Sequence, residues 1–211
     1  MKILLYIMAA ICGYLIAGFN PAITLSKAIY HKDIRECGSG NAGFTNFKRT
    51  FGNKWAWSVL VIDLSKAAVA ELIFASFFGK YYGTYQFGAA YTGAFVMLGH
   101  AYPIFYGFKG GKGFLVCLST MWVIDWKVGL ISTVIMIILL LTTKYMSLST
   151  VVAMLTCPIL MIFFNEPMSV TVIAAAMALF MTYRHKANFV RLKNGTESKF
   201  SIKDKKEKKE A

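Results

Sequence analysis

The order of apolar and polar residues divides this chain into long apolar runs separated by short polar segments. Runs of about 18 or more apolar residues are typical of transmembrane helices. Seven candidate runs cover residues 4–26, 56–79, 88–108, 113–125, 128–143, 146–164 and 168–183. We therefore expect an all-α fold, a polytopic membrane bundle of about seven transmembrane helices.

The fourth and fifth runs are the least regular part of this pattern, because each is short for a bilayer core of about 30 Å. Two arrangements remain open for them. They are two short helices in a thinned or partly re-entrant arrangement, or residues 113–143 form one long, broken span.

The distribution of charge favours the first arrangement. The net charge is +13, from 23 Lys+Arg against 10 Asp+Glu. The basic residues concentrate in Lys27–Lys54, Lys109–Lys112 and Arg184–Lys209, and the positive-inside rule places all three stretches in the cytoplasm. An even number of spans must then separate the second stretch from the third. Seven spans satisfy this parity and place the N-terminus outside and the C-terminus in the cytoplasm.

Composition narrows the class of protein further. Hydrophobic residues make up 57% of the chain, and the basic residues lie beside apolar runs, which indicates membrane lipids rather than nucleic acid as partners. The 4 cysteines form no C-x-x-C pair, so we expect free thiols and no metal site. Residues 1–200 are expected to form a single membrane-embedded domain. Residues 201–211 are expected to form a charged, disordered cytoplasmic tail.

The first polar segment with chemical potential is rich in glycine. It runs from Gly38 to Arg49 and places glycines at 38, 40 and 43. Glycines allow backbone amides to approach a ligand closely, and an arginine fork suits a phosphate or carboxylate. The alternative is an ordinary polar turn between two spans. The hydrogen-bonding candidates here are Ser39, Gly40, Asn41, Gly43, Thr45, Asn46 and Arg49.

The second segment, Gly107–Gly113, resembles a Walker A loop but departs from it twice. Tyr106 occupies the position of the first glycine, and Gly113 replaces the Ser/Thr, so ATP hydrolysis is disfavoured. A glycine-rich turn with two lysines before a helix still predicts an anion-binding nest of backbone amides. The alternative is a simple basic loop. The candidates are Lys109, Gly110, Gly111 and Lys112, whereas His100 reads more readily as a packing residue.

The third segment is Tyr183–Glu197. If it is helical, His185, Asn188 and Arg191 lie on one face at the membrane boundary and form a plausible polar site, unless the segment is only an amphipathic exit helix. A further polar feature lies inside the second span, where Asp63 and Lys66 are three residues apart. Charges inside a membrane are costly, so this pair is either structural or functional.

These segments together resemble the bacterial membrane family of acyl-phosphate:glycerol-3-phosphate acyltransferases (PlsY). The family pattern is S-G-N-x-G-x-T-N-x-x-R, then G-H-x-x-P-x-x-x-x-F-K-G-G-K-G, then R-H-x-x-N-x-x-R-L-x-x-G-T-E. This chain carries the three motifs in that order over Ser39–Arg49, Gly99–Gly113 and Arg184–Glu197. It departs from the family where Ala67 follows Lys66 and where Phe114 follows the lysine loop, outside the polar motif positions.

The resemblance implies acyl transfer from acyl phosphate to the 1-hydroxyl of glycerol 3-phosphate, which gives lysophosphatidate and phosphate in phospholipid biosynthesis. No cofactor or metal is implied, because the mixed anhydride is already activated. It also implies a bacterial cell membrane location with the site facing the cytoplasm, and a link to the soluble enzyme that makes acyl phosphate. The alternative function is a membrane transporter of a phosphorylated metabolite, which the lack of internal repeats disfavours.

The resemblance also suggests roles for single residues. Ser39 is expected to hold the acyl-phosphate group, and Lys112 to stabilise the leaving phosphate. His185 or the substrate's own phosphate is expected to accept the proton. The expected substrate-binding set is Gly40, Asn41, Gly43, Thr45, Asn46, Arg49, Lys109, Gly110, Gly111, Asn188, Arg191 and Glu197.

Overall fold

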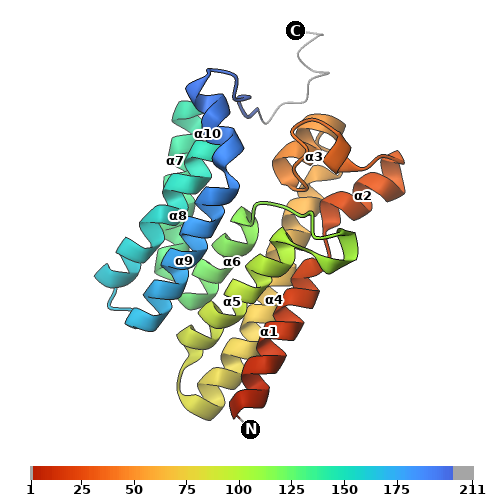
Figure 1. Cartoon of the computed structure of the whole chain (residues 1–211). Helices are drawn as coiled ribbons and strands as arrows, with labels where there is room; N and C mark the ends of the chain where they lie inside the picture. Colours follow the sequence, from red (N-terminus) through yellow and green to blue (C-terminus); the bar gives the residue numbers. More distant parts are fainter. Residues whose placement is uncertain (1, 202–211) are drawn as a thin grey trace.

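The structure, a computed structural model, describes residues 2–201 and contains only helices and loops within that range (Figure 1). The prediction of an all-α fold is confirmed. Seven helices run along the bundle: α1 (Lys2–Gly18), α4 (Ala56–Tyr82), α5 (Tyr85–Ala101), α6 (Phe114–Ile124), α7 (Trp126–Thr143), α8 (Met146–Phe163) and α9 (Met168–Arg184). The shorter elements gather at one end: α2 (Pro21–Tyr30), η1 (Ile34–Glu36), α3 (Phe44–Phe51), η2 (Ile104–Tyr106) and α10 (Lys186–Lys193).

The first predicted span, residues 4–26, is wrong as a single helix. The chain breaks at Phe19 and Asn20, and α2 turns away from α1 (Figure 1). Pro21 cannot donate a backbone hydrogen bond and therefore suits the first position of a new helix. The Asn20 side chain caps that helix by accepting a hydrogen bond from the Ile23 amide at 3.0 Å. The third predicted span, 88–108, likewise ends early, at Ala101.

Residues 113–143 form two separate helices, as the parity of the basic segments predicts. Asp125 adopts an extended conformation between them, and its carboxylate caps α7 by accepting from the Lys127 amide at 2.8 Å. With a rise of about 1.5 Å per residue, α6 is about 16 Å long and α7 about 27 Å. The glycine-rich loop that precedes α6 is therefore recessed below the end of α7, as Figure 1 shows.

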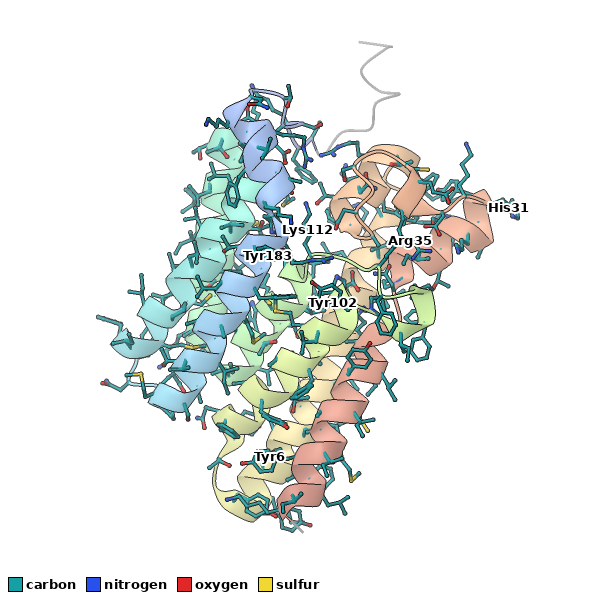
Figure 2. All side chains as sticks on the ribbon, viewed as in Figure 1. Tyr6, His31, Arg35, Tyr102, Lys112 and Tyr183 are labelled. Atoms are coloured by element: carbon teal, nitrogen blue, oxygen red, sulfur yellow. The ribbon has the colours of Figure 1, made fainter. Side chains whose placement is uncertain are left out.

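The outer surface of the bundle suits a lipid environment. Large apolar side chains project outward on α1, α7 and α8, where Ile3, Leu141, Ile159 and Phe163 are 67–77% exposed. Figure 2 shows side chains directed outward from the helices on the visible faces. By length and composition, Lys2–Tyr30, Trp126–Thr143 and Met146–Phe163 are long and apolar enough to cross a membrane.

The ends of the bundle are consistent with the predicted parity. Helix α1 begins at the end opposite α10, so the three motif segments share the α10 end (Figure 1). Which end faces the cytoplasm stays a prediction. The charged tail expected over residues 201–211 lies, apart from Ser201, outside the described residues.

Helix α5 lies at the centre of the bundle and packs against α1, α4, α6 and α9. Small residues permit this close approach, as is common where helices meet in a membrane. The tightest contact is at Gly99, where an added Cβ would lie 2.1 Å from the backbone oxygen of Tyr14 on α1. The α1–α5 contact thus requires glycine at this position.

We predict that Gly99→Ala destabilises the protein by about 1–3 kcal/mol, because a methyl group must push two backbones apart. Gly13→Ala is the matched control in the same α1–α5 contact. Its Cβ would lie 3.3 Å from the nearest atoms, in Thr92 on α5. Thermal unfolding in one detergent should show a clear loss for Gly99→Ala and a smaller one for Gly13→Ala. Equal losses would contradict the packing argument.

Candidate active site

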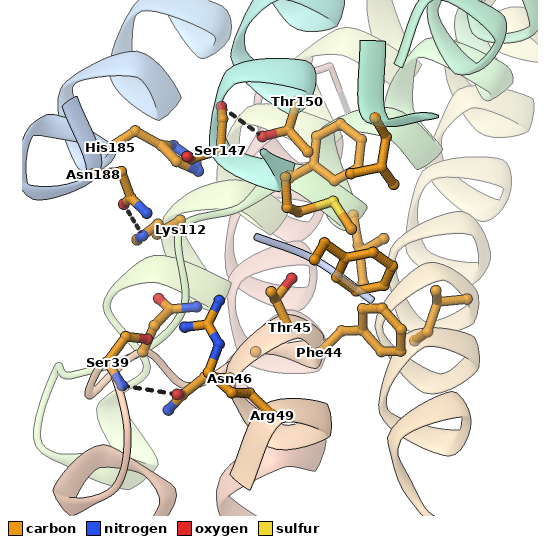
Figure 3. Close-up of a pocket in the computed structure, with 18 of the residues that line it drawn as sticks. Ser39, Phe44, Thr45, Asn46, Arg49, Lys112, Ser147, Thr150, His185 and Asn188 are labelled. Atoms are coloured by element: carbon orange, nitrogen blue, oxygen red, sulfur yellow. Dashed lines mark hydrogen bonds between the residues drawn. The ribbon is translucent and has the colours of Figure 1, made fainter. Parts of the chain in front are cut away.

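A cavity of about 430 Å³ lies at the end of the bundle that carries α3 and α10 (Figure 3). Its wall combines a polar part with an apolar part. The polar part contains Ser39, Asn41, Thr45, Asn46, Arg49, Asp63, His100, Lys112, Ser147, Thr150, His185, Asn188 and Glu197. The apolar part contains Phe44, Trp57, Leu60, Phe114, Leu115, Met136, Ile137, Leu140, Leu141, Met146 and Phe200.

One wall is formed by α3 and the loop before it, and Asn46 holds this loop in shape. The Asn46 side chain accepts a hydrogen bond from the Ser39 amide at 2.9 Å (Figure 3). It also donates to the carbonyls of Ile34 and Cys37 at 3.2 and 2.9 Å. Asn46 is 1% exposed, and its amide group is fully engaged by backbone partners. Its geometry is that of a residue that positions Ser39.

The other polar side chains of this wall are uncommitted. Within the described part of the chain, the side chains of Ser39, Asn41, Thr45 and Arg49 make no hydrogen bond to another residue. Burial lowers the pKa of Arg49, but a guanidinium stays charged in proteins. Three neutral hydrogen-bonding groups and one cation thus face the cavity without a protein partner. Such an arrangement suits an anionic ligand rich in oxygen atoms.

The opposite wall, formed by the loop before α6, the start of α8 and α10, is a connected hydrogen-bond network. The Lys112 ammonium donates to the Asn188 side chain, and Asn188 donates to Glu197 at 2.7 Å (Figure 3). Ser147 and Arg191 also donate to the Glu197 carboxylate, at 2.8 and 2.7 Å. Glu197 is therefore the residue on which this wall converges.

The electrostatics of this wall follow from the network. Burial tends to raise the pKa of Glu197, but the hydrogen bonds from Asn188, Ser147 and Arg191 outweigh it, so the pKa lies below its ordinary value. Burial, together with the nearby charge of Arg191, lowers the pKa of Lys112 to about 8. The ammonium of Lys112 is charged at neutral pH and easily influenced by an added negative charge.

His185 lies at the junction of α9 and α10 and faces the same cavity. Its Nδ1 lies 2.8 Å from the carbonyl oxygen of Met181, so Nδ1 carries the proton and Nε2 is the free acceptor. Burial and the neighbouring Lys112 lower the pKa of His185 to about 4. The imidazole is therefore neutral at physiological pH.

The glycine-rich loop corrects one expectation from the sequence. The amides of Gly110 and Gly111 donate to the carbonyls of Ala101 and His100, both at 3.1 Å, instead of forming an open anion nest. Their absent side chains matter more than their amides. A Cβ at Gly111 would lie 2.1 Å from Nε2 of His100, so only glycine lets the loop pack on the end of α5.

Two arginines hold this loop in place. Arg35, paired with Asp33 at 2.7 Å, donates to the carbonyl of Tyr106 at 2.6 Å. Arg184 donates to the carbonyl of Gly111 at 3.0 Å and lies over the ring of Tyr102. Figure 2 shows Arg35, Tyr102 and Lys112 gathered around this loop. The loop is thus tied both to the first motif segment and to the third.

The structure brings together most, but not all, of the residues expected from the sequence. Ser39, Asn41, Gly43, Thr45, Asn46, Arg49, Lys112, His185, Asn188 and Glu197 line the cavity. Gly40, Lys109, Gly110, Gly111 and Arg191 lie around it without lining it. Lys109 is exposed, and Arg191 acts on the site through Glu197.

Asp63 and His100 line the cavity but were not among the expected site residues. Lys66 pairs with Asp63 at 2.8 Å, and Nδ1 of His100 lies 3.4 Å from the same carboxylate oxygen. The Lys66 ammonium also donates to the carbonyl of Phe19 at 2.6 Å, where the break after α1 has left that carbonyl without a helical partner. The i,i+3 spacing indicated the Asp63–Lys66 pair, which is confirmed, but no sequence pattern linked it to His100.

The comparison with known protein families matches this geometry. The sequence model of the family described as glycerol-3-phosphate acyltransferase matches residues 7–195. This chain belongs to the glycerol-3-phosphate acyltransferase family. As a member of that family it is an acyltransferase, and all three motif segments lie within the matched region.

Relatives and solved structures agree over nearly the whole chain. The glycerol-3-phosphate acyltransferase of Lactiplantibacillus plantarum is 34% identical over 201 residues, which cover 94% of this chain and 92% of the relative. That of Rhizobium etli is 36% identical over 196 residues, which cover 92% and 91%. The crystal structure of PlsY (YgiH), an integral membrane glycerol 3-phosphate acyltransferase, in its glycerol 3-phosphate form is 30% identical. It superimposes with a TM-score of 0.86 and covers 93% of this chain and 96% of that one. Its lysophosphatidic acid form gives a TM-score of 0.82 at 29% identity, with 93% and 96% coverage.

For this acyltransferase we predict that Lys66→Met costs about 3–5 kcal/mol of stability, because it leaves a buried carboxylate without its main partner. The matched variant is the double change Asp63→Asn with Lys66→Met, which removes both charges. Chemical unfolding in detergent should show a smaller loss for the double variant than for Lys66→Met alone. A double variant that loses the sum of the two single changes would argue against coupling within the cluster.

Proposed function

We propose that this acyltransferase transfers an acyl group from acyl phosphate to the 1-hydroxyl of glycerol 3-phosphate. The hydroxyl oxygen forms a bond to the acyl carbonyl carbon, and the bond from that carbon to the phosphate oxygen breaks. The hydroxyl proton passes to a base, and the products are lysophosphatidate and phosphate. The relatives' names and the two forms of the solved structure support the acceptor and the product.

The observation that carries the proposal is that one cavity joins a cationic polar part to an apolar part. An acyl phosphate has the same two-part chemistry, because it combines a phosphate head with an apolar tail. The apolar wall includes Trp57, Ile137 and Leu141, which are 47%, 44% and 67% exposed on the outer face. The apolar part thus opens towards the lipid-facing surface, from which a donor tail can enter.

We assign the uncommitted wall to phosphate binding. Arg49 supplies the fork that binds phosphate oxygens, and Ser39, Asn41 and Thr45 orient the two substrates. Lys112 stands where α6 begins, so its ammonium and the helix N-terminus both favour negative charge on the leaving phosphate. Asn46 and Glu197 position these groups rather than bind substrate.

The proton acceptor is His185 or the phosphate of glycerol 3-phosphate. With Nδ1 tied to Met181, His185 offers Nε2 to the acceptor hydroxyl. Its pKa of about 4 makes it a weak base before substrate binds. A phosphate monoester has a second pKa near 6, which is closer to the working pH. The low pKa of His185 therefore supports proton transfer to the substrate phosphate, with His185 orienting the hydroxyl.

We also propose that the motif end of the bundle faces the cytoplasm in the cell membrane. The basic residues at this end support that orientation by the positive-inside rule. Acyl phosphate from a soluble enzyme would then reach the site from the cytoplasm and the adjoining leaflet. Residues up to about 200 would work as one catalytic domain, since the cavity draws on α3 to α10.

The test is an assay of purified protein in lipid with acyl phosphate and labelled glycerol 3-phosphate, with acyl-CoA and acyl carrier protein as rival donors. We expect lysophosphatidate from acyl phosphate alone. Arg49→Ala should lose about 100-fold or more in kcat/KM, because it removes a phosphate-binding cation. Lys109→Ala is the matched loss of a cation outside the cavity and should lose much less. Turnover only with a rival donor would overturn the donor assignment.

The pH dependence of kcat/KM should carry the signature of Lys112. Because its pKa is about 8, its charge is present below that pH and is lost above it, so activity should fall as pH rises through about 8. In Lys112→Arg, this fall should move to higher pH, since arginine stays charged. A fall unchanged in that variant would assign it to another group. His185, neutral above about pH 4, should cause no loss between pH 5 and 7.

A further inference from the structure

The last described residues cross the cavity from one wall to the other. The Phe200 amide donates to the carbonyl of Lys144, in the α7–α8 turn, at 2.7 Å. On the other side, the centre of the Phe200 ring lies 6.3 Å from that of Phe44, and the Lys48 ammonium lies 5.5 Å from it. Residues 198–200, here called the strap, therefore connect α3 to the α7–α8 turn. Figure 1 shows the chain after α10 running towards α3.

The strap forms part of the cavity wall. Ser198 and Phe200 line the same space as the apolar side chains of α4, α6 and α7. The half-buried ring of Phe200 packs in the apolar cluster that includes Phe44 and Leu115. A phenyl ring in this position limits the room available to an apolar ligand and supplies contact area to it.

The strap is also fixed to the polar part of the site. It follows Glu197 directly, and the hydrogen bonds from Ser147, Asn188 and Arg191 hold that carboxylate. A ligand whose phosphate lies beside Lys112 and whose tail enters the apolar part would therefore meet the strap. The family match ends at residue 195, so the strap lies outside the region that the family model describes.

We propose that Phe200 is a specificity-determining residue that contacts the acyl tail of the donor and sets the chain lengths this enzyme accepts. The proposal rests on the proposed function, because it assigns an acyl tail to the apolar part of the cavity. The ring closes the space between α3 and the α7–α8 turn. Its removal leaves the tail with fewer contacts and with more room.

The kinetic test compares Phe200→Ala and Phe200→Leu with Phe163→Ala, which removes a 74% exposed ring on α8 away from the cavity. The measurements are the KM for acyl phosphates of 12 to 18 carbons and the KM for glycerol 3-phosphate. In Phe200→Ala we expect the donor KM to rise about fivefold, from the lost apolar contact, and the preference among chain lengths to flatten. Phe200→Leu should be intermediate, and Phe163→Ala should match the original protein. An unchanged donor KM, or a rise confined to glycerol 3-phosphate, overturns the proposal.

A binding test makes the two proposals distinguishable. An alkyl phosphate with a diazirine in its chain should label the peptide that contains Phe200, and unlabelled acyl phosphate should compete with it. Labelling that no acyl phosphate competes with overturns the contact. If the protein shows no turnover of acyl phosphate but competed labelling at Phe200, the proposed function fails while the contact with an apolar tail stands.

Discussion

The buried charge cluster of Asp63, Lys66 and His100 is the contact on which the site depends. An unpaired charge in this bundle would be costly, so each member fixes the position of the others. Lys66 also satisfies the carbonyl of Phe19, which permits the break between α1 and α2 and directs the chain towards α3. The same cluster supports the imidazole of His100, on which Gly111 packs. One set of buried charges thus locates both the first and the second motif segments.

The depth of the site follows from the lengths of the helices around it. Helices α5 and α6 stop short of the end reached by α7, so the loop between them is recessed. Lys112 is therefore partly removed from water, which makes its charge both more expensive and more effective. The recess also brings the polar groups level with an apolar wall that opens to lipid. A phosphate and an acyl tail can then occupy adjoining parts of one cavity.

Much of this arrangement could be predicted from the sequence, and the failures have physical causes. Apolar runs located the helices, and the parity of basic segments separated α6 from α7. Hydropathy could not locate the break at Phe19, because apolar residues continue on both sides and only Asn20-Pro21 marks it. The motifs placed Ser39, Arg49, Lys112 and His185 on one cavity. Motif letters could not show that Asn46 and Glu197 spend their hydrogen bonds on protein partners, because partnership depends on distant backbone.

The unliganded site also links substrate binding to proton transfer. The positive charge of Lys112 is one reason that the pKa of His185 is low. A phosphate that binds beside Lys112 offsets this charge, and it also stabilises the ammonium that burial disfavours. Both effects act in the same direction, since Lys112 becomes more firmly charged and His185 more basic. The groups that stabilise the leaving phosphate and orient the hydroxyl therefore reach their working states only when the substrates are present, which limits side reactions of a reactive anhydride with water.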